Sequence, residues 1–468
     1  VVGKARALAA PAAHAPGESA AGTASRPADG TPASAHRTES WLKQTDWSAE
    51  SAADTPVRFA LIGAGGMGQN DMGTALRHEG TSIVAACDLY DSRLERCRER
   101  WGDRLPVTKD YREILRRRDV DAVIIATSDH WHQRIAIDAL QAGKAVYLEK
   151  PIVQKVDEGR PLVDAWKASG RPLIVGSQRT SNLLYQKARE LVSEGAIGKL
   201  NFAEAFWDRY SAIGAWQYTI PPSASEREID WARYRQGLPD KPFSAEEFFR
   251  WRNYDDYGTG VTGDLYVHLF TGLHFMADTI GPTRIHGTGG VRYWKDGRDA
   301  EDVLLGLYHY PERDAHPEFT ISMRVNFAAG SGDSSVLRLV GSEGEISVGW
   351  SQITLRKNRL SLRPGKSTGD FSEKVRQEVD DWYEIHHPEP APSLIEPREF
   401  VYRTPEGYSD SYDHFGNFLA AVRHGEPIVQ DPVFALRAAA PAILTTVSAR
   451  SGRSVGWDPE TLQQVPAV

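Results

Sequence analysis

The chain has 468 residues, enough for two domains that each bury a hydrophobic core. Hydrophobic residues make up 41% of it and charged residues 25%, as in a soluble globular protein. The net charge is −8 and no block rich in lysine and arginine stands out, so nucleic acid is not expected as a partner. No apolar run approaches the ~20 residues of a membrane span. The two cysteines, Cys87 and Cys97, predict neither a disulfide nor a redox site.

The first 54 residues differ from the rest of the chain. They are rich in Ala, Ser, Thr, Pro and Gly and lack hydrophobic periodicity, which predicts a disordered leader or linker. The small residues of 9–15 are like the end of an export signal, although no twin-arginine pair or long apolar core accompanies them. An export-signal remnant and a tail without a targeting role both stay open.

From Val57 onward, buried β-branched segments alternate with helical ones. Strands are expected at 57–62, 83–88, 121–127, 145–149 and 172–176, and helices at 68–78, 92–101, 110–117, 131–142 and 156–169. This alternation predicts a parallel, doubly wound α/β sheet over residues 55–178.

The pattern changes after residue 179. A helix is expected at 182–194, strands at 198–207, 283–293, 303–310, 319–327, 335–340, 345–349 and 353–356, and closing helices at 411–424 and 432–451. Consecutive strands without helices between them predict an antiparallel or mixed sheet, and so an α+β domain over 179–468. An aromatic-rich irregular region at 208–252 and a polar, proline-rich excursion at 366–404 interrupt it.

A Gly-x-Gly-x-x-Gly pattern follows the first expected strand. Gly63 permits the tight turn, Gly65 lets the backbone approach a pyrophosphate, and Gly68 lets the next helix pack close to the strand. The N-terminus of that helix favours phosphate. Asp88 ends the second strand about 20 residues further on, where a carboxylate binds the ribose hydroxyls of a dinucleotide. The alternative is a set of ordinary loop glycines near a surface carboxylate.

The side chains of Asp88 and Arg93 bear on the choice between NAD and NADP. Asp88 favours NAD because a carboxylate repels the 2′-phosphate of NADP. Arg93, which could accept that phosphate, keeps NADP as the less favoured alternative.

Ligands of open α/β sheets bind beyond the carboxyl ends of the strands. Thr127, His130, Trp131 and His132 follow one strand and are therefore expected near the dinucleotide. In the alternative interpretation, Asp129 simply caps the helix that follows.

Glu149 and Lys150 end the next strand and should lie at the same rim. A lysine near the reacting carbon can lower the pKa of a substrate hydroxyl or stabilise an alkoxide, although a lone lysine is ordinarily a solvated surface charge.

Asp264 and His268 are four residues apart, a spacing that places both side chains on one face of a helix. The imidazole could accept a hydroxyl proton as hydride leaves, and Asp264 could orient the imidazole or bind a substrate hydroxyl. A surface pair is the alternative; a metal site would need a further ligand at matching spacing, and none is predicted.

Together and in this order, these motifs resemble the Gfo/Idh/MocA family of glucose–fructose oxidoreductase and inositol dehydrogenase. The matching residues are Gly63-Ala64-Gly65-Gly66-Met67-Gly68, Asp88, Asp129-His130-Trp131-His132, Glu149-Lys150-Pro151 and Asp264-x-x-x-His268. The resemblance runs from about Val57 to Pro459. It implies an N-terminal Rossmann domain, a C-terminal α+β domain with an open sheet, and contacts through that sheet in a homodimer or homotetramer.

The resemblance also implies the roles of site residues. Lys150, Asp264 and His268 would be catalytic. The cofactor would be bound by Gly63, Gly65, Gly66, Met67, Gly68, Asp88, Arg93, Thr127, Trp131, His132, Glu149, Lys150 and Gln178. The Asp-His-Trp-His loop is similar to sugar-related members that are often exported, which favours export over a cytoplasmic location. The regions 208–252 and 366–404 exceed the family pattern and are expected to shape the substrate pocket or subunit contacts. Their tryptophans could stack on a sugar ring or simply pack.

The expected activity is NAD-dependent hydride transfer to or from a hydroxyl-bearing carbon of a sugar, sugar derivative or cyclic polyol. One alternative is a glycoside hydrolase that works by transient oxidation and elimination with a tightly bound NAD. A second alternative is a non-catalytic sensor of nucleotide and sugar.

Overall fold

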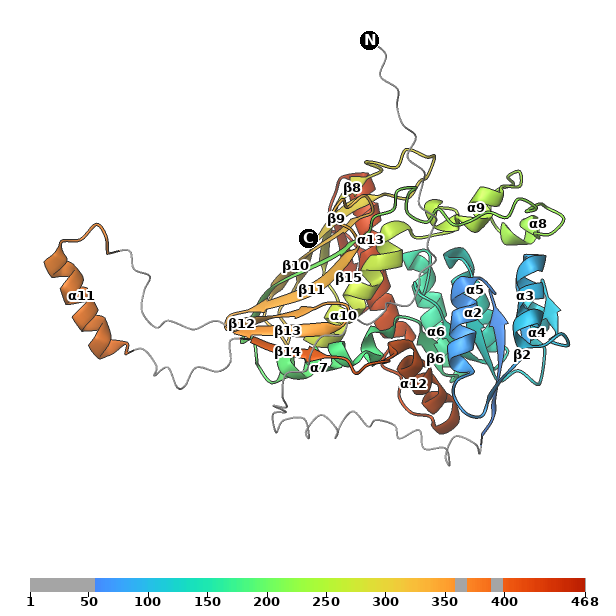
Figure 1. Cartoon of the computed structure of the whole chain (residues 1–468), viewed down its shortest axis with the longest axis horizontal. Coiled ribbons are helices and arrows are strands. Elements are labelled where there is room, and N and C mark those ends of the chain that lie inside the picture. The colour runs from blue at the N-terminus through green and yellow to red at the C-terminus, as the bar shows by residue number, and fades with distance from the viewer. Residues whose placement is uncertain (1–54, 358–367, 389–398, 468) are drawn as a thin grey trace, which may run out of the picture. The chain divides into compact units, whose positions relative to one another are not determined.

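The computed structural model describes residues 55–357, 368–388 and 399–467 (Figure 1). The expected leader at 1–54 and part of the excursion at 366–404 lie outside these ranges. The described chain forms two sheets, one of six strands and one of ten.

The six-stranded sheet is parallel throughout, with the order β3-β2-β1-β4-β5-β6. Its strands are β1 (Val57–Ile62), β2 (Thr81–Cys87), β3 (Val107–Thr108), β4 (Ala122–Ile125), β5 (Ala145–Leu148) and β6 (Leu173–Val175). The central strands β4, β5 and β6 are buried along their whole length, as expected for a sheet covered on both faces. The strand order reverses between β1 and β4, so a crevice for a ligand lies beyond the carboxyl ends of these two strands. The expected doubly wound sheet is confirmed.

Helices that follow the strands cover this sheet. They are α2 (Gly66–Ala75), α3 (Asp91–Trp101), α4 (Tyr111–Leu115), α5 (His132–Gln141) and α6 (Gly159–Ser169). A further helix, α12 (Asp410–His424), returns from near the end of the chain to the same sheet and packs against α2 (Figure 1). Its Phe415 ring stacks on Tyr147 of β5 with centroids 4.1 Å apart, and its Tyr412 stacks on His78 at 3.9 Å. The core of the first sheet therefore depends on residues from the C-terminal part of the chain.

The ten-stranded sheet has the order β14-β13-β12-β11-β7-β10-β9-β8-β15-β16. Its strands are β7 (Leu200–Asp208), β8 (Arg284–Gly290), β9 (Val303–Tyr310), β10 (Phe319–Asn326), β11 (Ser334–Gly341), β12 (Gly344–Val348), β13 (Gln352–Lys357), β14 (Glu399–Arg403), β15 (Val455–Asp458) and β16 (Gln463–Val465). Strands β7 and β10 pair in parallel, and the other described pairs are antiparallel. The expected mixed, mostly antiparallel sheet is thus confirmed.

One face of this second sheet is covered by helices α7 (Leu183–Ser193), α10 (Val267–Ala277) and α13 (Pro432–Ser451). Residues of β9 and β10 accordingly alternate between buried and partly exposed positions. Helix α13 is long and apolar enough to cross a membrane by length and composition alone, but 61% of that window is buried inside the protein. It packs along β8 and against α10, as a core helix does.

The aromatic lobe, which we define as residues 209–257, contains α8 (Trp231–Tyr234) and α9 (Ala245–Phe249). Its side chains form a hydrophobic cluster of their own that includes Tyr90 from the first sheet's side of the molecule. Two backbone hydrogen bonds, from Asp230 to Leu89 at 2.9 Å and from Asp91 to Glu228 at 3.1 Å, hold the lobe to the segment that follows β2. The lobe is therefore attached at the edge of the sheet where a ligand is expected.

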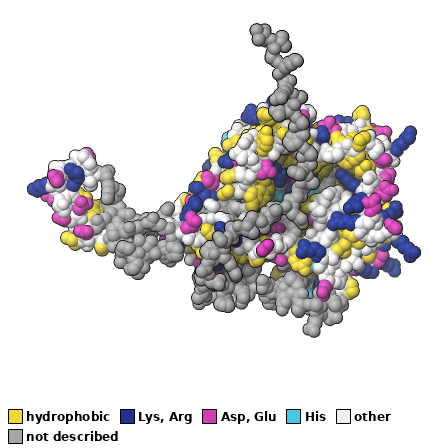
Figure 2. Space-filling model, in the orientation of Figure 1, with side chains coloured by type: hydrophobic (Ala, Val, Ile, Leu, Met, Phe, Trp, Pro, Cys, Tyr) yellow, Lys and Arg dark blue, Asp and Glu magenta, His cyan; other side chains and the backbone are white. Residues whose placement is uncertain are grey.

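The remaining described helix is α11 (Glu373–His386), which has no buried residue. On the face of the molecule shown in Figure 2, basic and acidic side chains are interspersed over the helices of the first sheet.

Candidate active site

The turn after β1 has the geometry that its glycines predict. Gly63 has a φ of 92°, and a Cβ there would lie 2.6 Å from the carbonyl carbon of Ala126. A Cβ on Gly68 would lie 2.0 Å from the Gly63 carbonyl oxygen. No side chain caps the first turn of α2, which begins at Gly66, so its N–H groups are available to an anion. This turn therefore fits a pyrophosphate.

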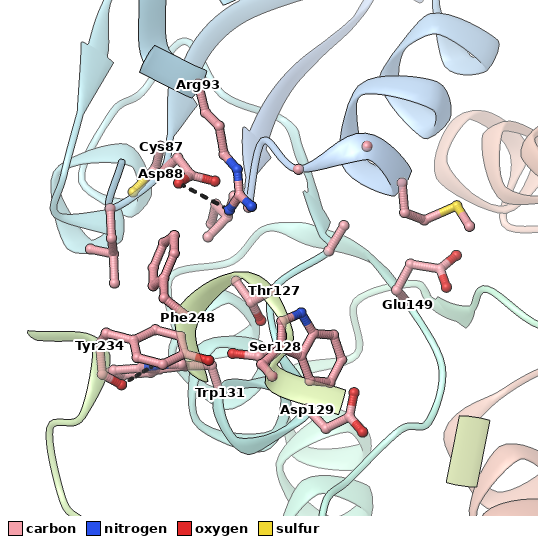
Figure 3. A pocket seen from close by; sticks show the side chains of 18 of the residues that line it. Cys87, Asp88, Arg93, Thr127, Ser128, Asp129, Trp131, Glu149, Tyr234 and Phe248 are labelled. Atoms are coloured by element: carbon pink, nitrogen blue, oxygen red, sulfur yellow. Dashed lines mark hydrogen bonds and ion pairs between the residues drawn. The ribbon is translucent and has the colours of Figure 1, made fainter. Parts of the chain in front are cut away.

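Both this turn and Lys150 line a cavity of about 510 Å³. Figure 3 shows some of its other lining side chains, among them Asp88, Thr127 and Glu149. Its size is that of an ordinary small-molecule site. The predicted cofactor-binding residues that line it are Gly63, Gly65, Gly66, Met67, Asp88, Arg93, Thr127, Trp131, Glu149 and Lys150.

The Asp88 carboxylate is held in place at one end of the cavity. It accepts hydrogen bonds from the backbone N–H groups of Ala64 at 2.7 Å and Tyr90 at 3.0 Å. The Arg93 guanidinium lies 3.6 Å from it and 5.3 Å from the Phe248 ring centroid. The two side chains that bear on the choice between NAD and NADP thus lie together on one wall, opposite Trp131 and Tyr234 in Figure 3.

The other end of the cavity contains an ion pair between the two halves of the chain. The Lys150 ammonium lies 2.7 Å from a carboxylate oxygen of Asp264 and also donates to the Asp264 backbone carbonyl at 2.9 Å. The Arg252 guanidinium contacts the same carboxylate oxygen at 3.2 Å. Burial by itself would raise the pKa of Asp264, but Lys150 and Arg252 outweigh it and hold that pKa below its usual value. The carboxylate is therefore ionised at neutral pH.

His268 lies about one turn beyond Asp264, at the start of α10. Its Nδ1 is 3.1 Å from the Ser177 hydroxyl oxygen, which donates its proton to Thr271 at 3.3 Å. The serine oxygen must therefore accept from Nδ1–H, which leaves the lone pair on Nε2. Burial and the positive charge of Lys150 lower the pKa of His268 well below 6.5. The imidazole is neutral at pH 7 and can accept a proton.

Asp264 and His268 do not themselves line the cavity; Asp264 reaches its wall through Lys150 and Arg252. A short π-helix over Thr262–Tyr266 carries Asp264 and continues into α10. The structure thus brings Lys150 and Asp264 into contact across the two sheets and places His268 next along the same helix.

Four residues expected near the cofactor do not line the cavity. One is His130, which contacts the Tyr234 carbonyl oxygen at 2.9 Å; the other three are His132, Gln178 and Gly68. The buried His132 ring lies between the backbone carbonyls of Pro151, at 2.7 Å, and Thr127, at 3.2 Å. Gln178 donates to the Tyr147 hydroxyl at 3.3 Å. Gly68 lies behind the turn, against Gly63. None of the three lines the cavity, so their contacts position the walls of the cavity instead.

The loop after β4 holds the aromatic lobe. Asp129 does not cap the helix that follows; it accepts hydrogen bonds from the Thr259 N–H at 3.0 Å and hydroxyl at 2.7 Å. Burial raises the pKa of Asp129 to about 7. His130 and Trp131 both contact the Tyr234 carbonyl oxygen, at 2.9 and 3.1 Å.

The region 208–252, with its aromatic residues Trp216, Trp231, Phe248, Phe249 and Trp251, was expected to shape the substrate pocket or subunit contacts. Its members in the cavity wall are Tyr218, Thr219, Arg233, Tyr234, Phe248, Phe249, Trp251 and Arg252. An arginine directly after a tryptophan, in an aromatic-rich segment, was the available signal for Arg252, whose guanidinium lies 4.2 Å from the Trp251 ring centroid.

Comparisons with known proteins agree with this architecture. The model of the NAD-binding Rossmann fold of the Gfo/Idh/MocA oxidoreductase family matches residues 57–177. The model of the C-terminal α/β domain of the same family matches residues 230–456. Levoglucosan dehydrogenase, solved in complex with NADH and levoglucosan, is 16% identical with a TM-score of 0.60, over 86% of this chain and 99% of that one. At this identity the likeness concerns the fold.

Among curated proteins, inositol 2-dehydrogenase of Salmonella paratyphi B is 25% identical over 179 residues, which are 37% of this chain and 53% of that protein. Glycosyl hydrolase family 109 protein 1 of Akkermansia muciniphila is 28% identical over 161 residues, 32% of this chain and 33% of that protein. The alignment thus spans about half the length of the first relative and a third of the second. Because the two family models together match more than half of the residues, the chain belongs to the Gfo/Idh/MocA family of oxidoreductases.

Proposed function

We propose that this protein is a NAD-dependent dehydrogenase that acts on a hydroxyl-bearing carbon of a sugar, sugar derivative or cyclic polyol. The observation that carries the proposal is the Lys150–Asp264 ion pair, with a neutral His268 beside it, at the end of a cavity that begins at a phosphate-binding turn. The inositol and levoglucosan dehydrogenases among its relatives support the substrate class.

The residues of the cavity fit a dinucleotide. The uncapped N-terminus of α2 would hold the pyrophosphate, and the Asp88 carboxylate, fixed by the Ala64 N–H, would bind the ribose hydroxyls. NAD, when bound, accepts the hydride from the substrate carbon. Asp88 favours NAD, while Arg93 beside it leaves NADP as the less favoured cofactor.

The chain's own side chains handle the substrate oxygen and its proton. The Lys150 ammonium, held by Asp264, donates a hydrogen bond to the oxygen and stabilises its developing negative charge. Nε2 of His268 accepts the hydroxyl proton, since burial keeps this imidazole unprotonated. Asp264 remains ionised and fixes the position of Lys150.

Turnover of a sugar panel with added NAD tests the proposal. We expect the absorbance of reduced nicotinamide to rise with at least one sugar or cyclic polyol. Ligand binding without any change in nicotinamide absorbance, across the panel and in both directions of reaction, would contradict it and favour a sensor.

A second function is favoured by the glycosyl hydrolase relative. In this function the same residues would oxidise a glycoside transiently, eliminate its aglycone, allow water to add in its place and reduce the product again, so NAD is not consumed. Release of an aglycone by the purified protein without added NAD, and without net nicotinamide reduction, would replace the dehydrogenase by this reaction.

A further inference from the structure

Two arginines lie close to Trp207, the side chain that contacts His268. The Trp207 ring at the end of β7 lies 5.6 Å from the His268 ring, measured between centroids. The guanidinium carbons of Arg179 and Arg209 each lie 5.6 Å from the same indole. Arg179 is two residues after Ser177, the partner of His268. Positive charge is therefore concentrated beside the proposed base.

The neighbouring carboxylates are already engaged. Asp264 is bound by Lys150 and Arg252, and Asp208 pairs with Arg324 at 2.8 Å. Asp410 accepts a hydrogen bond from Asn182 at 2.9 Å and is 3.9 Å from Arg179.

Both arginines have N–H groups that no carboxylate of the described residues binds at hydrogen-bond distance. Nε of Arg179 is buried without a hydrogen-bond partner. Within the described residues, the Arg209 side chain makes no ion pair or hydrogen bond, and its recorded contact is with Trp207. A buried donor without a partner destabilises the folded protein, a cost that a bound anion would remove.

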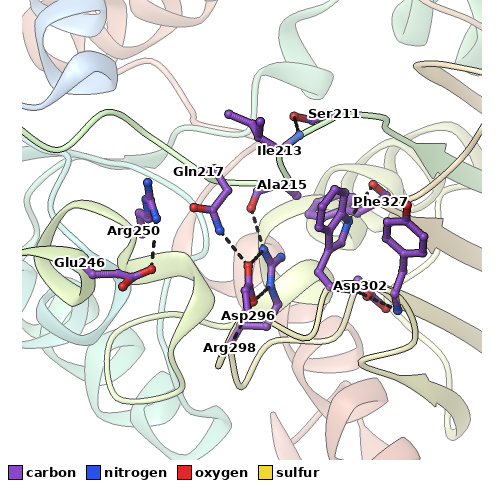
Figure 4. A network of polar contacts seen from close by, with 12 residues as sticks. Ser211, Ile213, Ala215, Gln217, Glu246, Arg250, Asp296, Arg298, Asp302 and Phe327 are labelled. Carbon is purple, nitrogen blue, oxygen red and sulfur yellow. Dashed lines mark hydrogen bonds and ion pairs between the residues drawn. The ribbon is translucent and has the colours of Figure 1, made fainter. Parts of the chain in front are cut away.

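Hydrogen bonds connect the strand end that carries Arg209, and the segment after it, to neighbouring parts of the chain. The Arg209 backbone N–H donates to Asn326 at 2.9 Å. In the segment that follows, Gln217 donates to Asp296 at 2.8 Å, and Arg298 contacts both Asp296 and the Ala215 carbonyl (Figure 4). The guanidinium therefore extends from a strand end whose backbone is hydrogen-bonded to β10.

The electrostatics of the site agree with this placement. Burial and Lys150 are the two largest causes of the lowered pKa of His268, and the positive charges of Arg179 and Arg209 add to it. Both arginines thus act electrostatically on the imidazole that the proposed function makes the base.

We propose that the substrate is an acidic sugar whose anionic group, a carboxylate or a phosphate, is bound by Arg209 and Arg179 beside His268. This rests on the proposed function and names the substrate class of the same site. Trp350, which is 59% exposed and meets Trp207 edge to face at 5.2 Å, supplies an apolar surface next to the arginines for the face of the sugar ring.

Matched sets of sugars test this inference. NAD-loaded protein is assayed with glucose, glucuronate, gluconate and glucose 6-phosphate, and with the corresponding galactose and mannose compounds. We expect kcat/KM for an acidic member to exceed that for its neutral counterpart by about tenfold or more, since a charge-assisted pair contributes about 1.5–3 kcal/mol. Comparison of the sugar carboxylates with the sugar phosphates identifies which anionic group the site binds.

The variant Arg209→Gln should lower kcat/KM for the acidic sugar about 10- to 100-fold more than for the neutral one, mainly through KM, and Arg209→Lys should restore part of it. Arg356→Gln is the control, because this exposed arginine of β13 pairs with Glu345 and Glu399 away from the site. Preference for neutral sugars, or an equal effect of Arg209→Gln on both kinds, would overturn the inference while the dehydrogenase stands.

Calorimetric binding of the same sugars to the NAD-loaded protein separates the two proposals if no sugar is turned over. Binding of acidic sugars that Arg209→Gln abolishes would uphold the anion site and contradict the dehydrogenase. Equal binding of acidic and neutral sugars would overturn the anion site.

Discussion

The protonation states near Lys150 follow from what each side chain faces. Asp264 has two cations within 3.2 Å and stays ionised, whereas His268 faces a hydroxyl and an indole and stays neutral. A base and an anchored cation therefore coexist at pH 7, as proton removal from a hydroxyl requires.

We predict that His268 stays unprotonated well below pH 6.5. Its folded-state pKa is lowered by burial and by Lys150, so the neutral form persists as the pH falls through 6.5. Histidine-selective ¹⁵N NMR, with the His268 signals identified by their loss in His268→Gln, measures this. Protonation of the ring at or above pH 6.5 would contradict the burial of the imidazole.

Asp129 gives a prediction for stability. Burial raises its pKa from 3.8 to about 7, so between these values the folded state holds a proton that the unfolded state has released. The free energy of unfolding then falls as the pH rises toward 7, by up to about 1.4 kcal/mol per pH unit from this group. The variant Asp129→Asn removes this dependence.

Urea unfolding of both proteins at several pH values checks this prediction. Between pH 5 and pH 8, we expect the free energy of unfolding of Asp129→Asn to rise by roughly 2 kcal/mol relative to that of the wild type. If the free energy of unfolding depends on pH in the same way in both proteins, the pKa of Asp129 is not raised in the folded state.

The sequence predicted well which residues lie near the cavity. It predicted less well which of their side chains point into it. Asp88, Arg93 and Lys150 line it as expected. His132 follows directly on Trp131, yet it points to the Pro151 carbonyl while Trp131 lines the cavity. The direction of each ring in a 3₁₀ turn followed by a helix depends on tertiary packing, which a single sequence does not contain.

At the scale of elements, the turn after β1 and the start of α2 were predictable, because only glycine avoids a steric clash at Gly63 and Gly68. Strands β3, β14, β15 and β16 were not, since each has two to five residues and depends on pairing with a neighbour rather than on a hydrophobic pattern. The lobe has its own aromatic cluster, so its order also depends on contacts distant in sequence.

The close packing of α2 predicts a difference between two glycines. Gly68→Ala should lower the free energy of unfolding of the NAD-free protein by about 1–3 kcal/mol, because the new methyl group meets the Gly63 carbonyl. Gly66→Ala is the matched control, since a Cβ there meets nothing within 4 Å. Equal stability of the two variants in chemical denaturation would show that α2 can shift without cost.

The aromatic lobe should contribute to cofactor affinity. Phe248 lines the cavity beside Arg93, whereas Phe243 packs on Trp231 inside the same lobe. We expect Phe248→Ala to raise the Kd for NAD about fivefold to tenfold, and Phe243→Ala to change it less, as measured by calorimetry. A larger effect of Phe243→Ala would indicate that the lobe acts by its stability alone.

At the scale of the whole molecule, the site is assembled from both sheets. Lys150 comes from the end of β5, and Asp264 and His268 come from the helix that packs on the ten-stranded sheet. The resemblance to the Gfo/Idh/MocA family predicted this convergence, whereas the rule that parallel strands end at one edge predicted the position of Lys150 alone. The contact of Lys150 with the Asp264 backbone carbonyl and the role of Arg252 required the structure.

The most direct test is a single-turnover measurement of nicotinamide absorbance with the wild type and Lys150→Met, each with NAD occupancy determined in the same sample and with a sugar that the wild type oxidises. We predict a rate at least about 10²- to 10³-fold lower for Lys150→Met with NAD still bound, because the cation beside the reacting oxygen is lost. Hydride transfer at the wild-type rate in the NAD-loaded variant would contradict the site that Lys150, Asp264 and His268 are proposed to form.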